Sequence, residues 1–148
     1  MKGKILRKKE IERKLSDISD SVEIVEENIP PDFSVFSTLG LKKDGIYKKI
    51  EFAIESMIDI LNIINSDLRF GTPENEEDII KNMDKNKVFD KKILDVVNKM
   101  KGFRNILVHR YGEISDEQAY ESIKEGIGDF ENFVKEVEVF LRNNDKEN

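Results

Sequence analysis

The chain has 148 residues, of which 38% are hydrophobic and 38% are charged, and its formal net charge is -6. This length suits one domain that buries a core of its own, so we expect a single domain over residues 1–148 with a polar tail at 142–148. The absence of cysteine excludes disulfides and cysteine-based zinc sites, and the acidic balance argues against DNA and against a broad nucleic-acid surface, so any RNA contact must be local.

Residues 4–28 are predicted to form the first long helix. Its apolar residues step by four and three, the spacing of one buried stripe: Ile11, Leu15, Ile18, Val22, Val25 and Ile29. Pro30 and Pro31 then stop it. The opening stretch MKGKILRKKEIERKL contains no signal-peptide core, and no apolar run approaches the roughly 18 residues that cross a bilayer. We therefore expect a cytoplasmic protein without a membrane segment.

The proline-rich segment 30–43, PPDFSVFSTLGLKK, is expected to be a loop that packs onto the bundle through Phe33, Phe36 and Leu39. A second helix is predicted over residues 44–66. Its apolar residues cover a wider arc than those of the first helix, so it should lie centrally in the fold or at an interface.

A short third helix should start with Thr72 as the N-cap and Pro73 in the first turn, and should run to about Met83. The fourth helix is predicted from Phe89 or Asp90 to His109 or Tyr111. These two helices are separated by the polar break DKNK.

Ser115 and Gln118 form a capping box for the last helix, which should extend to about Leu141. Gly126 and Gly128 lie inside it and cost stability unless another backbone packs closely there. No stretch alternates with a period of two long enough to make a sheet. The sequence therefore predicts an all-α, up-and-down helical bundle of four long helices plus one short helix.

On the fourth helix, Arg104 and Tyr111 fall in the arc of the buried stripe at about 100° per residue. The stripe comprises Phe89, Ile93, Val96, Val97, Met100, Phe103 and Leu107. A charge there is costly unless it is paired or faces a cleft. Asn105 and the only histidine, His109, lie on roughly the opposite side. Arg104 and His109 can meet only if the helix unwinds near Val108 or if a second copy supplies its own motif across a two-fold axis, and we favour the dimer.

The stretch GFRNILVHRY resembles the signature of the HEPN superfamily, and more narrowly that of the HepT-like toxins. That signature is an arginine with a polar residue directly after it, a histidine after four intervening positions, and a tyrosine two residues further on. The residues that carry the match are Arg104, Asn105, His109 and Tyr111. Residues from about 44 to 141 are also similar to that family in their helical pattern.

The resemblance implies a homodimer that acts as a metal-independent endoribonuclease toxin, with no cofactor and no metal. Arg104 would bind the scissile phosphate and His109 would move protons near neutral pH. Asn105 would orient the phosphate or the His109 ring, and Tyr111 would shape the cleft or form a hydrogen bond with the substrate. The implied partner is an antitoxin nucleotidyltransferase of the MntA type, which silences the toxin by AMP transfer (AMPylation) to Tyr111 and so places a phosphate against Arg104.

Other interpretations stay open. The chain could instead be a non-catalytic dimeric HEPN partner that binds the nucleotidyltransferase and is modified by it, or, more weakly, a nucleotide-binding HEPN module. A lone histidine near a helix end is more often a dipole partner or a solvated residue. Arg110 is most simply a solvated charge, and the lysines near the motif are mostly an exposed face that could steer RNA at low salt.

Overall fold

The computed structural model describes residues 5–109 and 111–144, with only the backbone of Tyr111. Within these ranges the chain forms six α-helices and one 3-10 turn, and no strand. The elements are α1 (Lys8–Asn28), α2 (Phe33–Phe36), α3 (Leu41–Asp67), α4 (Glu76–Lys85), α5 (Lys91–His109), η1 (Tyr111–Glu113) and α6 (Asp116–Asn144). The all-α prediction is confirmed, with four long helices and the short α4. The single turn α2 is an addition.

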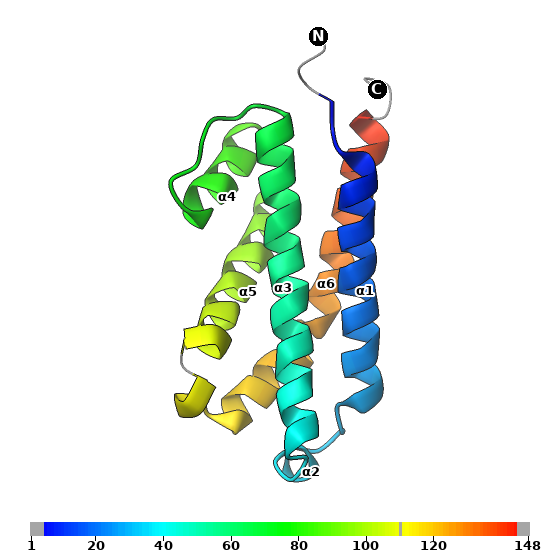
Figure 1. Ribbon diagram of the computed structural model, residues 1–148, viewed down its shortest axis with the longest axis vertical. Helices are drawn as coiled ribbons and strands as arrows, with labels where there is room; N and C mark the ends of the chain where they lie inside the picture. Colours follow the sequence, from blue (N-terminus) through cyan, green and yellow to red (C-terminus); the bar gives the residue numbers. More distant parts are fainter. Residues whose placement is uncertain (1–4, 110, 145–148) are drawn as a thin grey trace.

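The four long helices run up and down, and α3 lies among the others (Figure 1). It contacts α1, α4 and α5, and it buries side chains around most of its circumference. This confirms the central position that its wide apolar arc predicted. None of the helices in the described ranges is both long enough and apolar enough to cross a membrane.

The first helix begins at Lys8, so the predicted start at residue 4 is wrong. The backbone N–H of Arg7 donates to Asp67 Oδ2 at 2.9 Å, and Arg7 Nε donates to Asp67 Oδ1 at 3.0 Å. These bonds hold the chain against the end of α3, and Leu6 is buried beside them. The start of α1 is therefore set by a contact between residues far apart in the sequence.

The segment 30–43 packs onto the bundle as expected, and its centre is the fully buried Phe36. The Phe36 ring lies 5.0 Å from that of Tyr120 and 5.9 Å from that of Tyr47, measured between centroids. The Tyr120 hydroxyl donates to the Pro30 carbonyl at 2.7 Å. Part of the segment is helical, since α3 starts at Leu41, three residues before the predicted position.

The predicted start of the short helix is also wrong, because the N-cap of α4 is Asn75 and not Thr72. Asn75 Oδ1 accepts a hydrogen bond from the backbone N–H of Asp78 at 2.9 Å, and Asp78 Oδ2 accepts one from the backbone N–H of Glu74 at 2.9 Å. These two bonds satisfy the backbone N–H groups of Glu74 and Asp78 around Asn75, so the helix begins at Glu76.

The last two helices follow the prediction closely. Asp90 Oδ1 accepts from the backbone N–H of Ile93 at 3.0 Å where α5 starts, and Ser115 Oγ accepts from that of Gln118 at 3.4 Å where α6 starts. Helix α6 extends beyond Leu141 to Asn144, so the first residues of the expected polar tail are helical.

The two glycines inside α6 have no backbone packed against them. A Cβ at Gly126 would meet the Met100 side chain at 4.0 Å, and one at Gly128 would meet nothing within 4 Å. Close helix packing therefore does not explain either glycine.

Asp116 fastens the start of α6 to α3. Its carboxylate accepts hydrogen bonds from the Tyr47 hydroxyl at 2.6 Å and from Lys43 Nζ at 2.7 Å. Burial acts to raise the pKa of Asp116, but the hydrogen bonds from Lys43 and Tyr47 outweigh it and leave the pKa below its ordinary value.

We expect Asp116→Asn to lower the free energy of unfolding by about 1–2 kcal/mol at neutral pH, because the Lys43 and Tyr47 hydrogen bonds lose a charged acceptor. A depressed folded-state pKa stabilises the fold above the unfolded value of about 4 and loses that effect as pH falls through the folded value. The deficit should therefore shrink in urea unfolding below about pH 4. The control is Glu117→Gln, an exposed charge in the same first turn. A deficit that persists undiminished in acid contradicts the prediction.

Candidate functional site

Three of the motif residues, Arg104, Asn105 and His109, lie on the second half of α5, which stays helical through His109. Local unwinding near Val108, one of the two ways in which Arg104 and His109 could meet, is therefore not observed. Five residues of a regular helix place their side chains about 140° apart around the axis. Within one copy, Arg104 and His109 thus leave α5 in different directions.

Arg104 is a covered and paired charge. Its side chain is 12% exposed, and Nη2 donates to Glu76 Oε1 at 2.5 Å. Its Nε donates to Asn105 Oδ1 at 3.0 Å. The arc of the buried stripe required a partner for this guanidinium, and the structure supplies two.

Asn105 and His109 are exposed, as the helical spacing predicted. The Asn105 side chain bonds Arg104, so these two motif residues are brought together. His109 is the last residue of α5 and, within the described part of the chain, forms no hydrogen bond or ion pair. Arg110 lies outside the described residues. Tyr111 opens the turn η1, and its side chain is likewise outside what the structure describes.

The sequence pattern missed Glu76 as a partner of Arg104. An acidic residue is common in the first turn of a helix, so nothing in the sequence assigned Glu76 a second role as the partner of Arg104. Helix α4 is held in place by the buried Asn65, whose Nδ2 donates to the Gly71 carbonyl at 2.8 Å and whose Oδ1 accepts from Asn82 Nδ2 at 2.8 Å. This network ties the second half of α4, and the loop that leads into α4, to α3.

A carboxylate on α3, that of Glu55, also interacts with Arg104. Burial, and then the neighbouring Glu51, raise the pKa of Glu55, whereas the positive charge of Arg104 acts to lower it. Glu51 in turn accepts from Lys48 Nζ at 3.0 Å. Arg104 is therefore close to carboxylates from two helices, Glu76 on α4 and Glu55 on α3, whereas the charge of Glu51 is paired with Lys48.

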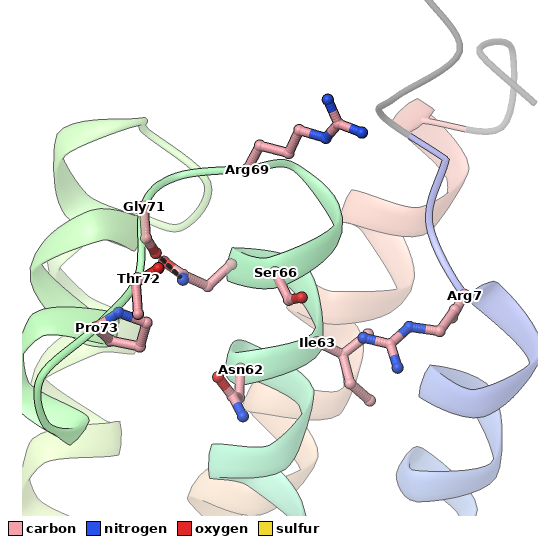
Figure 2. A pocket seen from close by; sticks show the side chains of 9 residues that line it. Arg7, Asn62, Ile63, Ser66, Arg69, Gly71, Thr72 and Pro73 are labelled. Atoms are coloured by element: carbon pink, nitrogen blue, oxygen red, sulfur yellow. Dashed lines mark hydrogen bonds between the residues drawn. The ribbon is translucent and has the colours of Figure 1, made fainter.

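A separate polar hollow of about 550 Å³ lies where α3 leads into the loop before α4 (Figure 2). Arg69 on its rim points outward, and the Arg7 guanidinium is engaged by Asp67. The hollow contains no motif residue. Neither arginine therefore offers its guanidinium to a phosphate inside the hollow.

Comparison with known proteins shows the family to which the chain belongs. The model of the Ribonuclease HepT-like family matches residues 18–137. The chain is 29% identical over 92 residues to the mRNA nuclease HepT of Shewanella oneidensis, an alignment that covers 62% of this chain and 69% of that protein.

Solved structures agree with the sequence comparison. The tri-AMPylated HEPN toxin of Shewanella oneidensis, in complex with its MNT antitoxin, superposes with a TM-score of 0.79 and 25% identity over 88% of this chain and 97% of that one. The cytosolic protein YutE of Bacillus subtilis, of unknown function, has the same fold, with a TM-score of 0.78 and 19% identity over 93% of this chain and 92% of that one.

The electrostatic link between Arg104 and α3 can be measured directly. We expect Arg104→Ala to raise the pKa of Glu55 further, because the lost positive charge stabilised the carboxylate. Carbon-detected NMR titration of the Glu55 carboxyl measures this value, and Arg69→Ala, a change on the remote hollow, serves as the control. An unchanged or lower Glu55 pKa in Arg104→Ala contradicts the described position of the guanidinium.

Proposed function

The chain belongs to the HepT-like ribonuclease family, and on this premise we propose that it is the metal-independent endoribonuclease toxin of a toxin and antitoxin pair. The observation that carries the proposal is the placement of Arg104 and His109 on one regular helix within the matched range. The toxin and antitoxin context is supported by the Shewanella oneidensis relative, which was solved with its MNT antitoxin.

The reaction that fits these side chains is attack by the RNA's own 2′-hydroxyl. The 2′ oxygen bonds to phosphorus, the bond from phosphorus to the 5′ oxygen breaks, and the products are a 2′,3′-cyclic phosphate and a 5′-hydroxyl. One proton must leave the 2′-hydroxyl and one must reach the 5′ oxygen, and imidazole does both near neutral pH. Arg104 stabilises the charge that builds on the phosphate, while Asn105 holds the guanidinium.

We further propose that the cleft forms between two copies of the chain. Side chains on a helix lean toward its N-terminus, and Arg104 reaches Glu76 on α4. Figure 1 shows α4 beside the earlier part of α5, away from the end that carries His109. The Arg104 guanidinium is thus directed away from its own histidine, and two α5 helices related by a two-fold axis would bring it toward His109 of the other copy.

We expect purified wild-type protein to cut RNA in EDTA, and expect Arg104→Ala and His109→Ala each to lower the rate at least about 100-fold because each removes one half of the chemistry. If the site is shared, mixed dimers of the two variants contain one intact Arg104 and His109 pair. An equal mixture that exchanges subunits should then recover about one quarter of the wild-type rate, since about half of the dimers are mixed and each has one working site. Gel-based cleavage of a labelled RNA measures all four samples.

The outcomes separate the components of this proposal. Wild-type protein that leaves RNA intact contradicts the nuclease function. Cleavage that is lost in both variants but not restored by mixing places Arg104 and His109 of the same copy in one site. Cleavage abolished by EDTA contradicts metal independence.

The alternative is a non-catalytic partner that an antitoxin nucleotidyltransferase binds and modifies. It is favoured by the covered state of Arg104 and by the AMPylated state of the Shewanella oneidensis relative. Such a partner binds the transferase tightly and is modified without cutting RNA, so the cleavage assay separates the two functions.

Both functions assign the same modification site. With a cognate transferase and ATP, the Tyr111 hydroxyl would attack the α-phosphate of ATP, form a phosphodiester with AMP and release pyrophosphate. We expect intact-mass spectrometry to show the gain of at least one AMP in the wild-type chain and none in Tyr111→Phe. Tyr120→Phe is the control, because the Tyr120 ring is buried and its hydroxyl bonds Pro30. A Tyr111→Phe chain that still gains AMP overturns the assignment.

A further inference from the structure

Two side chains accept hydrogen bonds from Arg104 at the edge of the guanidinium that an RNA phosphate would use. A guanidinium offers five N–H donors, and the edge formed by Nε and Nη2 is one of its two-pronged faces. In the structure Nε donates to Asn105 and Nη2 donates to Glu76. A phosphate that takes this edge must therefore displace the neutral Asn105 amide oxygen and the charged Glu76 carboxylate, and of the two Glu76 is the competing anion. The Arg104 side chain is only 12% exposed.

Glu76 can leave this contact without unfolding its helix. Its side chain is 38% exposed, and its one ion pair in the described chain is with Arg104. The start of α4 is held independently by the Asn75 and Asp78 hydrogen bonds. The Glu76 side chain can thus move into solvent while the backbone that carries it stays in place.

The surrounding charge makes the exchange costly for RNA. Glu55 on α3 lies close enough to Arg104 for their charges to interact, and Glu51 lies beside Glu55. With Glu76 in contact, an incoming phosphate meets a guanidinium that is already neutralised and carboxylates that repel it. Removal of the Glu76 charge would remove the one ion pair that Arg104 forms in the described chain and so strengthen its attraction for phosphate.

We propose that Glu76 is an internal competitor of the RNA phosphate for Arg104, so that substrate binds by exchanging one anion for another. This inference rests on the proposed ribonuclease function for its substrate, and it adds a residue on α4 that sets substrate affinity. Glu76 takes no part in bond breaking. By pairing with Arg104, Glu76 lowers the fraction of molecules in which the guanidinium is free to bind phosphate.

The test compares Glu76→Gln with Glu77→Gln. Both changes remove one negative charge from the first turn of α4, but Glu77 is exposed and forms no ion pair within the described residues. We expect Glu76→Gln to lower KM for RNA about fivefold with kcat within about twofold of wild type, and expect Glu77→Gln to change neither by more than about twofold. Glu76→Asp, which keeps the charge on a shorter arm, should shift KM in the same direction as Glu76→Gln.

A second readout does not depend on cleavage. The Nε–H resonance of Arg104 is followed by NMR while inorganic phosphate is added, with assignment by comparison with Arg104→Ala. We expect Glu76→Gln to bind phosphate at Arg104 several-fold more tightly than wild type and Glu77→Gln to match wild type. This titration decides the role of Glu76 even if the wild-type chain cuts no RNA.

Three results overturn the inference. One is a lower kcat at unchanged KM in Glu76→Gln, which would make Glu76 a residue that positions Arg104 for the reaction. Another is equal behaviour of Glu76→Gln and Glu77→Gln, which would reduce the effect to long-range charge. The third is unchanged phosphate binding at Arg104 in Glu76→Gln.

Discussion

The ion pair between Arg104 on α5 and Glu76 on α4 is the interaction on which the arrangement of the candidate site depends. Arg104 lies in the arc of α5 that also carries the buried stripe, where an unpaired charge is costly. Its pairing with Glu76 meets that requirement and ties the start of α4 to the second half of α5. The position of α4 itself is set by the buried Asn65, which bonds the loop and Asn82, and by the Asn75 cap at its start.

Helical periodicity predicted the elements well because α1, α5 and α6 each bury one stripe and α3 buries a wider arc, and both patterns are local properties of the sequence. The ends were less predictable where they depend on distant contacts. Helix α1 starts late because Arg7 is held by Asp67 on another helix. Helix α4 starts at Glu76 because the Asn75 side chain accepts from the backbone N–H of Asp78 and the Asp78 side chain accepts from that of Glu74. Thr72 and Pro73 carried a plausible signal that the structure does not use.

In the candidate site, too, the local features were predictable from the sequence and the contacts between distant residues were not. Spacing along α5 predicted that Arg104 faces inward while Asn105 and His109 face outward, because these directions follow from helical geometry alone. The partner of Arg104 lies 28 residues earlier, on a different helix, and no local pattern encodes that distance. A burial argument could have found it, since a guanidinium in a buried stripe demands an acidic neighbour and α4 opens with three acidic residues.

A protein with a net charge of -6 can act on RNA only if its contact with phosphate is confined to a few cations. If phosphate contact is limited to a few cations, the nearby carboxylates matter, because Glu76 and Glu55 compete with phosphate for the Arg104 guanidinium. Within one copy the nearest anions have the advantage, since they are covalently held and Asn105 helps to fix the geometry. In the proposed dimer, a phosphate would gain the advantage because a second copy brings its own histidine to the far side of the same phosphate, so that one anion is held from both sides. Under that proposal, the pairing inside the monomer and the catalysis between monomers would be two states of a single guanidinium, and Glu76, which stabilises the first state, would set the affinity of the second.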